Sequence, residues 1–140
     1  MAFRILALLG LLLSFALPVG AQDKSTDRAA IRDIISRQIE AFRRDDGATA
    51  FGLASPNIQG MFGSPEIFMD MVRQGYAPVY RPRSVEFGDL TELGGQPAQK
   101  VYVIAPDGRQ VTAIYVMTQL PDGTWRVDGC YLQAPNPNQA

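Results

Sequence analysis

The stretch VYVIAPDGRQVTAIYVMTQLPDGTWRVDGCY, residues 101–131, decides the fold of this chain. It contains one turn signal twice, Ala-Pro-Asp-Gly-Arg at 105–109 and Leu-Pro-Asp-Gly-Thr at 120–124. Proline followed by aspartate and glycine favours a type I turn whose glycine takes the left-handed conformation, a common connection in β-hairpins. We therefore predict three antiparallel strands joined by two hairpins.

The apolar residues of this stretch alternate along each strand, and their spacing predicts the strand register. A three-residue loop at the second turn places Met117 opposite Val127. Continuing the same pairing across three strands gives one apolar face, which we predict to be the core. This face comprises Val101, Val103, Val111, Ala113, Tyr115, Met117, Trp125, Val127 and Tyr131.

The opposite face of these strands mixes apolar and polar residues. A sheet face in water carries mostly charged residues, serine and threonine, so apolar side chains there indicate that something covers them. We predict a second copy of the chain as the cover, because most small homo-oligomers are twofold dimers. The predicted interface residues are Tyr102, Ile104, Ile114, Val116 and Leu132.

A fourth strand precedes these three, at about residues 83–92. The Gly94-Gly95 pair after it predicts a tight turn into the next strand. Two registers remain open. A two-residue turn alone places Val85 and Phe87 on the mixed face, whereas one β-bulge moves them into the core.

The N-terminal half has the spacing of helices. Ser25 or Thr26 provides the N-cap of a first helix, in which isoleucines and Phe42 recur at helical intervals. Asp46 follows the end of this helix and caps a short second one at 48–54. The apolar stripe of the first helix predicts that it packs on the sheet.

Two serine–proline pairs, Ser55-Pro56 and Ser64-Pro65, each place a capping serine before a proline at the first helical position. The second pair begins an amphipathic helix that ends near Gly75. We expect this helix to bury one side against the sheet. The residues expected to be buried are Phe68, Met71 and Val72, and those expected to be exposed are Met69 and Arg73.

Three helices followed by a four-stranded antiparallel meander, with the helices on one sheet face, define an α+β domain. Over about residues 28–134 the chain also resembles a bacterial family of short exported proteins with a domain of unknown function. The arrangement is similar to the nuclear transport factor 2-like, or cystatin-like, cone fold. This resemblance implies N-terminal helices on a curved sheet that encloses a pocket, and it implies no particular reaction. The motifs that carry it are ASP at 54–56, MFGSPE at 61–66, MVRQGY at 71–76 and RP at 81–82.

Residues 1–21 are predicted to be a signal peptide. Arg4 precedes an apolar run at 5–17, and small residues lead to a cleavage point after Ala21. The run is shorter than the roughly 20 apolar residues that span a bilayer, and an uncleaved anchor is the alternative. We therefore expect a periplasmic or secreted protein with no membrane attachment after cleavage. The remainder is expected to be a single domain at 22–134 and a flexible tail at 135–140.

The composition excludes several classes of function. The chain holds 13 basic and 14 acidic residues, so it lacks the basic excess of a nucleic-acid-binding protein. It contains no histidine, which removes the commonest general base and most zinc sites. Met69 and Met71 point apart on their helix and cannot share a soft metal ion, so we expect no metal and no cofactor. Cys130 is the lone cysteine and is expected to be a small buried hydrophobe.

An enzyme of isomerase or dehydratase type is one alternative function. The resemblance to the cone fold implies that such an enzyme would use a buried acid, whose pKa is raised, together with a tyrosine donor inside the cone. Tyr115 and Tyr131 fall on the predicted core face, but Asp128 falls by alternation on the opposite face. We interpret Asp128 as part of a surface charge cluster with Arg126 or Lys100, and we assign no catalytic residue.

Three arginines and two tyrosines gather where the helices give way to the first strand. Arginine offers planar, bidentate recognition of carboxylate or phosphate, and tyrosine offers a rigid wall. We predict a site for a small anionic ligand there. Its residues are Arg73, Tyr76, Tyr80, Arg81 and Arg83. The alternative is a solvated loop whose arginines pair with Asp70, Glu86 or Glu92.

Together these features favour a non-enzymatic exported module that binds a ligand or a protein partner. The alternatives are the cone-pocket enzyme and a purely structural homodimer. A closed apolar core favours the structural role, an open cavity with Arg73, Arg81 or Arg83 at its mouth favours ligand binding, and a buried acid that faces Tyr115 favours chemistry.

Overall fold

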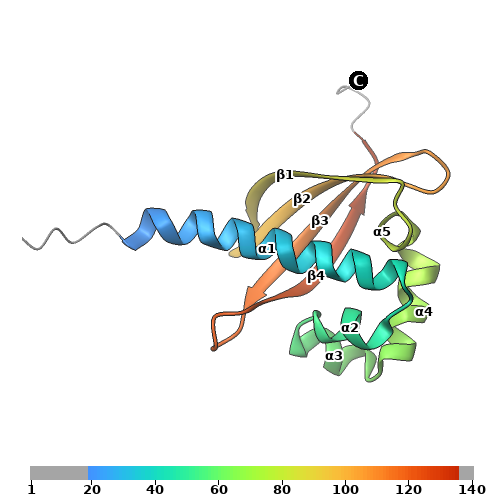
Figure 1. Ribbon diagram of the computed structural model, residues 1–140, viewed down its shortest axis with the longest axis horizontal. Coiled ribbons are helices and arrows are strands. Elements are labelled where there is room, and N and C mark those ends of the chain that lie inside the picture. Colours follow the sequence, from blue (N-terminus) through green and yellow to red (C-terminus); the bar gives the residue numbers. More distant parts are fainter. Residues whose placement is uncertain (1–18, 136–140) are drawn as a thin grey trace, which may run out of the picture.

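The structure is a computed structural model that describes residues 19–135, with side chains described from Lys24 onwards. It has two layers, in which helices cover one face of a single sheet (Figure 1). Residues 1–18 of the predicted signal peptide and residues 136–140 of the predicted tail lie outside the described residues. The elements in chain order are α1 (Val19–Arg43), α2 (Gly47–Gly52), α3 (Pro56–Phe62), α4 (Pro65–Gly75), α5 (Ala77–Tyr80), β1 (Ser84–Leu93), β2 (Gln96–Ile104), β3 (Gln110–Gln119) and β4 (Trp125–Gln133).

The four strands form the predicted meander, with the order β1-β2-β3-β4 and every neighbouring pair antiparallel. Both residues of the Gly94-Gly95 turn have positive φ, which a two-residue hairpin turn of type I′ requires. The two Pro-Asp-Gly turns end on Gly108 and Gly123, each with φ of 87°. Turn chemistry therefore explains all three connections.

We call the sheet face toward the helices the inner face, and the opposite one the outer face. The inner face is the core, and the register predicted between β2 and β3 is confirmed. From α1 the expected apolar stripe packs on it, including Ile31, Ile35 and Ile39. The buried residues that the strands contribute to the core are Val101, Val103, Val111, Ala113, Tyr115, Met117, Trp125 and Val127.

A β-bulge in β1 decides between the two registers left open. The pairing with β2 shifts between Phe87 and Leu90, and Val85 and Phe87 consequently pack against the core. Gly88 lies in the bulge, and the ring of Tyr102 stands 2.6 Å from the position that a Cβ on Gly88 would take. A larger residue at this position would displace the ring.

A second bulge, in β4, corrects the predicted core at its end. The strands β3 and β4 pair as predicted as far as Val127, and the register then shifts by one residue at Asp128. Such a shift exchanges the two faces of a strand. Tyr131, predicted in the core, is therefore on the outer face and 56% exposed, whereas Leu132, predicted on the outer face, packs against the core.

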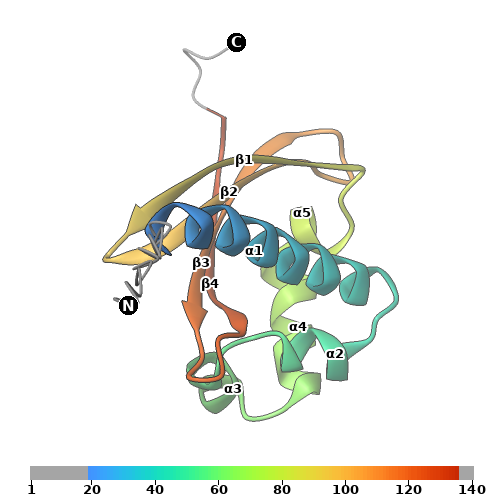
Figure 2. The same cartoon turned by 60° about the vertical axis from the view of Figure 1, so that its left-hand side comes forward.

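Helix α1 begins earlier than predicted. The expected N-cap at Ser25 or Thr26 is wrong, because the helix already runs from Val19 and no proline interrupts it. Its first buried side chain among those described is Ile31. The N-terminal turns of α1 accordingly extend past the strands in the view of Figure 1, and Figure 2 shows α1 running across the sheet.

The other predicted N-caps, at Asp46, Ser55 and Ser64, are present. Ser55 Oγ accepts a hydrogen bond from the Ile58 N–H at 3.2 Å, and Ser64 Oγ accepts one from the Ile67 N–H at 3.3 Å. Asp46 caps α2 through its carboxylate, as expected. The described residues nevertheless form five helices and not three, because α3 is a separate helix and α5 is an additional single turn.

Helix α4 is amphipathic as predicted, but the burial predicted for its two methionines, Met69 and Met71, is wrong. Phe68 and Val72 are buried, which confirms that part of the prediction. Met69, expected to be exposed, is only 2% exposed, and Met71 is half-buried. The reason is a second neighbour: the Met69 Cγ lies 2.9 Å from the position of a Cβ on Gly47 in α2, so α4 packs on α2 as well as on the core.

Candidate functional site

A pocket lies between the helices and the inner face of the sheet, beside the C-terminal half of α1. Its volume is about 290 Å³, close to the lower limit of roughly 300 Å³ for sites that bind small molecules. Residues from α1, α3, α4, α5, β3 and β4 contribute to it. The lining residues are Gln38, Phe42, Ala54, Ile58, Met61, Phe62, Phe68, Met71, Val72, Tyr76, Val79, Tyr115, Val127, Asp128, Gly129, Cys130 and Tyr131.

Aromatic packing holds the helical walls of the pocket together. The ring of Phe68 lies at the centre of the set, with its centroid 5.5 Å from that of Phe51, 5.8 Å from Phe62 and 6.2 Å from Phe42. The rings meet at tilted or edge-on angles, which aromatic pairs prefer. Because these four residues come from α1 to α4, the pocket wall depends on all four helices.

The pocket reaches the protein surface. Two of its lining residues, Met61 from α3 and Tyr131 from β4, are 67% and 56% exposed. Large apolar side chains that are exposed beside a cavity are typical of the mouth of a binding site. Because β4 is an edge strand of the sheet, Tyr131 belongs to the outer face and also lies at the edge of the pocket.

Tyr115 lines the pocket from β3 and is 1% exposed. Its hydroxyl oxygen has no hydrogen-bond partner among the described residues. Burial raises the pKa of Tyr115 well above its usual value of 10.0, and the neighbouring Cys130 adds to the rise. The hydroxyl therefore stays protonated, and its polar neighbour is the Cys130 thiol, which hydrogen-bonds only weakly; this is an uncommon condition for a buried hydroxyl.

The Cys130 thiol lies beside Tyr115, where the β4 bulge has turned it inward. Burial raises the pKa of Cys130 to about 12, a rise that the Tyr115 hydroxyl partly offsets. Such a thiol is protonated at neutral pH and unreactive, as expected for a small hydrophobe. The Tyr76 hydroxyl donates to the Cys130 carbonyl at 3.1 Å, and burial raises the pKa of Tyr76 as well.

Asp128 is in the pocket wall and not in a surface charge cluster, which corrects the sequence interpretation. Its Oδ1 accepts a hydrogen bond of 2.6 Å from Ser55 Oγ, and its Oδ2 accepts one of 3.0 Å from Gln96 Nε2. Neither Arg126 nor Lys100 pairs with it among the ion pairs of the described residues. The bulge, which alternation cannot anticipate, gives Asp128 this position.

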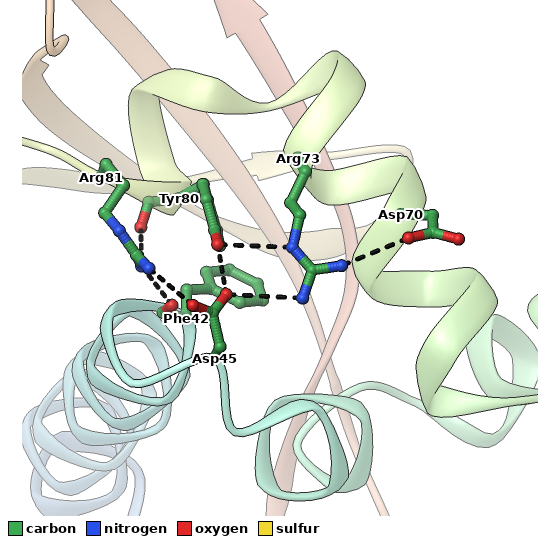
Figure 3. Close-up of polar contacts among 6 residues, drawn as sticks. All are labelled: Phe42, Asp45, Asp70, Arg73, Tyr80 and Arg81. Atoms are coloured by element: carbon green, nitrogen blue, oxygen red, sulfur yellow. Dashed lines mark hydrogen bonds and ion pairs between the residues drawn. The ribbon is translucent and has the colours of Figure 1, made fainter.

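Three of the five residues of the predicted anion site meet at the surface beside α4 and α5 (Figure 3). Arg73 lies between two carboxylates, with Nη2 3.4 Å from Asp45 Oδ1 and Nη1 3.2 Å from Asp70 Oδ1. Arg73 Nε also donates to the Tyr80 hydroxyl at 3.3 Å, and that hydroxyl donates to Asp45. The pairing with Asp70 was one of the alternatives expected, whereas the pairing with Asp45 was not.

Arg81 completes this set. Its Nη2 lies 2.8 Å from Asp45 Oδ2, its guanidinium stacks 4.1 Å from the centroid of the Tyr80 ring, and its Nη1 donates to the Phe42 carbonyl in α1. The Tyr80 hydrogen bond and the two arginines lower the pKa of Asp45, and the same tyrosine raises the pKa of Arg73. We call Asp45, Asp70, Arg73, Tyr80 and Arg81 the Asp45 cluster.

The other two residues of the predicted anion site lie elsewhere. Tyr76 is in the pocket wall. Arg83 is exposed beside the turn between β2 and β3, where its Nη1 lies 3.7 Å from the position of a Cβ on Gly108. The structure therefore divides the five residues among three places.

The predicted interface residues occupy the outer face, with the exception of Leu132. Tyr131 takes its place and pairs with Ile114 across the strands. Tyr102 is 45% exposed on the same face. Val116 lies on the same face but is only 7% exposed within the single chain, so it is not available as predicted. We call the exposed set the outer patch, which comprises Tyr102, Ile104, Ile114 and Tyr131.

Sequence reasoning missed several residues of these sites. Asp45 has a φ of 52°, in the left-handed region that aspartate and asparagine enter more readily than most residues. Its place directly after a helix was therefore a local signal of a special backbone position. No local signal links Ser55 and Gln96 to Asp128, because these contacts span 73 and 32 residues.

The described residues also limit what the site can hold. Within residues 24–135, no group of three or more histidine, cysteine, aspartate or glutamate side chains is placed to bind a metal ion. None of the helices in the described part of the chain combines the length and apolar character needed to cross a membrane.

The fold and the pocket define a small α+β domain with an apolar cavity between its helices and its sheet. The chain belongs to the family described as "Domain of unknown function (DUF4864)", whose match covers residues 24–140, and the predicted resemblance to such a family is confirmed. No curated protein sequence matches the chain. A similar solved structure is an NTF-2 like protein of unknown function from Burkholderia xenovorans LB400, with a TM-score of 0.48 and 13% identity over 78% of this chain and 87% of the other.

Proposed function

We propose that this protein is exported and binds a small apolar molecule in its pocket without catalysing a reaction. The observation that carries the proposal is the pocket itself, a cavity of about 290 Å³ with mostly apolar walls and a mouth at Met61 and Tyr131. An apolar pocket of this size that opens to the surface has the size and lining typical of a small-molecule site.

The volume of the pocket bounds the size of the occupant. A water molecule takes up roughly 30 Å³ in the liquid, so a cavity of about 290 Å³ corresponds to about ten waters. The ligand accordingly has on the order of ten non-hydrogen atoms inside the pocket. A longer molecule fits only if part of it extends past the mouth.

The polar groups of the pocket support binding over catalysis. Asp128 is the acid in the wall, but both of its carboxylate oxygens already accept hydrogen bonds from Ser55 and Gln96. The Cys130 thiol, with its pKa raised to about 12, is not a nucleophile at neutral pH. No histidine is present anywhere in the chain to act as a general base.

Export is supported by the N-terminal sequence, in which Arg4 precedes the apolar run at 5–17. Cleavage after Ala21 removes only the first three residues of α1, well before its first buried side chain at Ile31. The packed domain therefore keeps its contacts. Mass spectrometry of the protein from the periplasm or medium is expected to give a chain that begins at Gln22, and a chain of full length contradicts the proposal.

Titration with the apolar fluorescent dye 1-N-phenylnaphthylamine tests ligand binding. We expect saturable binding to the unmodified protein and affinity about tenfold lower, or about 1.4 kcal/mol weaker, for Ile58→Trp, which places a larger ring in the pocket wall. Ile67→Trp is the matched control, because Ile67 is 57% exposed and does not line the pocket. Equal affinity of all three proteins contradicts the proposal.

A homodimer through the outer patch is a second candidate, supported by the exposure of Tyr102 and Tyr131 on one sheet face. Sedimentation at micromolar concentration is expected to give twice the chain mass, and Tyr131→Asp is expected to return the monomer. Met61→Asp changes an equally exposed apolar residue on α3 and is expected to leave the dimer intact. A monomeric unmodified protein contradicts this candidate.

A further inference from the structure

Three buried polar side-chain atoms have no hydrogen-bond partner among the described residues: Arg32 Nε, Gln99 Oε1 and Tyr115 Oη. The first two lie beside the β1 bulge, where both side chains donate to the Gly88 carbonyl. Tyr115 is the one of the three that lines the pocket. Because an unpaired buried hydroxyl destabilises a protein, one that lies in a pocket wall points to a partner supplied by the ligand.

The other buried or half-buried polar side chains of the pocket already have partners. Tyr76 donates to the Cys130 carbonyl at 3.1 Å, and Gln38 Nε2 donates to the Ala50 carbonyl at 3.1 Å. Asp128 accepts two hydrogen bonds. The thiol next to Tyr115 is a weak acceptor and a weak donor. Tyr115 is thus the strong donor of the pocket wall that lacks a strong acceptor, and a ligand reaches its buried hydroxyl once the side chains that cover it move aside.

The charge of the pocket sets a second condition. Of the residues that line it, all within the described part of the chain, Asp128 is the charged one, and no lysine or arginine is among them. An anion that enters would lose its hydration with no cation to compensate, and it would lie near the Asp128 carboxylate. The arginines of the Asp45 cluster do not line the pocket and are paired outside it.

We propose that the ligand is an uncharged molecule whose carbonyl-type oxygen accepts a hydrogen bond from Tyr115, with its apolar part against the phenylalanine walls. This inference rests on the proposed function and adds to it the chemical class of the ligand. A carbonyl fits better than an alcohol, because a carbonyl only accepts hydrogen bonds. An alcohol would bring its own donor into a wall whose strong acceptor, Asp128, is already engaged.

Four compounds with one phenylpropyl-sized skeleton test the inference: propylbenzene, propiophenone, 3-phenylpropanoate and 3-phenylpropylamine. Their affinities are measured by displacement of 1-N-phenylnaphthylamine from the unmodified protein and from Tyr115→Phe. We expect the ketone to bind the unmodified protein about tenfold more tightly than propylbenzene, and the carboxylate to bind at least about tenfold more weakly than the ketone. In Tyr115→Phe the preference for the ketone is lost, while the affinity for propylbenzene is kept and shows that the variant is folded.

The outcomes separate the inference from the proposed function. If neither propylbenzene nor propiophenone displaces the dye, the pocket does not bind small apolar molecules and both proposals are wrong. If both compounds bind equally well to the unmodified protein, the proposed function stands and the role of Tyr115 is wrong. The chemical class is also wrong if 3-phenylpropanoate or 3-phenylpropylamine binds more tightly than the ketone, or if Tyr115→Phe keeps the preference.

Discussion

The Asp45 cluster and the pocket hold polar groups in opposite states. In the cluster, which is exposed, the Asp45 carboxylate pairs with Arg73 and Arg81 and accepts a hydrogen bond from the Tyr80 hydroxyl. In the pocket, the Tyr115 hydroxyl is buried among apolar side chains and has only the weakly hydrogen-bonding Cys130 thiol beside it. The charged groups of the Asp45 cluster thus have partners within the protein. The hydroxyl that lacks a strong partner, that of Tyr115, lies in the mostly apolar pocket.

This difference assigns the two regions different roles. The Asp45 cluster connects the end of α1 to α4 and α5, and these same helices supply walls of the pocket. We infer that it holds the pocket in shape. An anionic ligand at these arginines, as the sequence predicts, has less support, because Arg73 and Arg81 would first have to leave Asp45.

The largest effect is expected in the aromatic wall. Phe68→Ala removes the ring that contacts Phe42, Phe51 and Phe62 and is expected to lower the free energy of unfolding by about 3–5 kcal/mol. Met69→Ala, between α4 and α2, is expected to cost about 2–5 kcal/mol because this side chain is also buried. Urea unfolding measures both.

Ile67→Ala, on the same helix but exposed, is the control and is expected to change stability little. If Phe68→Ala is as stable as Ile67→Ala, the aromatic rings do not hold the pocket wall.

A smaller effect is expected when the Asp45 charge is removed. Asp45→Asn keeps a residue that tolerates the left-handed backbone but loses its charge pairing with Arg73 and Arg81. Stability should fall, and the fall should shrink as salt screens the pairs in the unmodified protein. Asp33→Asn, which breaks only the exposed pair with Arg37, is the control and should change stability less.

The same carboxylate predicts a pH dependence. The pKa of Asp45 is lower in the folded protein than its usual 3.8. Its contribution to the free energy of unfolding is therefore fully present above that value and is lost as the pH falls through the folded-state pKa.

Calorimetric titration with phosphate adds a test of the anion site. If Asp45 occupies the arginines, phosphate should bind more tightly to Asp45→Asn than to the unmodified protein, and equal binding contradicts this role.

Much of the fold was predictable because its signals are local. The Pro-Asp-Gly turns, the Gly94-Gly95 pair and the serine caps each act through residues a few positions apart, and all are present. The bulge at Asp128 was not predictable in this way. It lies where the segment before α3 joins the edge of β4, with Ser55 N–H donating to the Val127 carbonyl and Ser55 Oγ to Asp128.

The candidate site was harder to predict for the same reason. The density of arginines at 73–83 is visible in the sequence, but their partner Asp45 lies 28 and 36 residues earlier. The β4 bulge turned Cys130 into the pocket wall and moved Tyr131 to the outer face. The arginines therefore indicated an anion site at the surface. The Tyr115 hydroxyl, the donor left without a strong acceptor, lies in the core as a result of tertiary contacts.

The stability of the protein at alkaline pH tests the burial of the Cys130 thiol. The pKa of Cys130 is raised from 9.0 to about 12 in the folded protein. The unfolded chain therefore releases this proton first, so stability is unaffected below pH 9 and falls as the pH rises from 9 towards 12. Cys130→Ala should weaken this decline in urea unfolding measured from pH 8 to 11, and an unchanged decline contradicts the burial of the thiol.

A stability change of about 1 kcal/mol is expected when one hydroxyl is removed from a pocket tyrosine. Tyr115→Phe removes a buried hydroxyl that has no strong partner, so the ligand-free protein should keep its stability or gain about 1 kcal/mol. Tyr76→Phe removes a hydroxyl of the same pocket that donates to the Cys130 carbonyl, so it should lose about 1 kcal/mol. Both changes delete one oxygen atom from a pocket tyrosine, and urea unfolding of the two variants side by side therefore isolates the effect of the partner. If Tyr115→Phe is destabilised as much as Tyr76→Phe, the Tyr115 hydroxyl is already satisfied in the free protein, with the Cys130 sulfur as its acceptor. The pocket would then be as complete as the Asp45 cluster, and no donor would remain for a ligand.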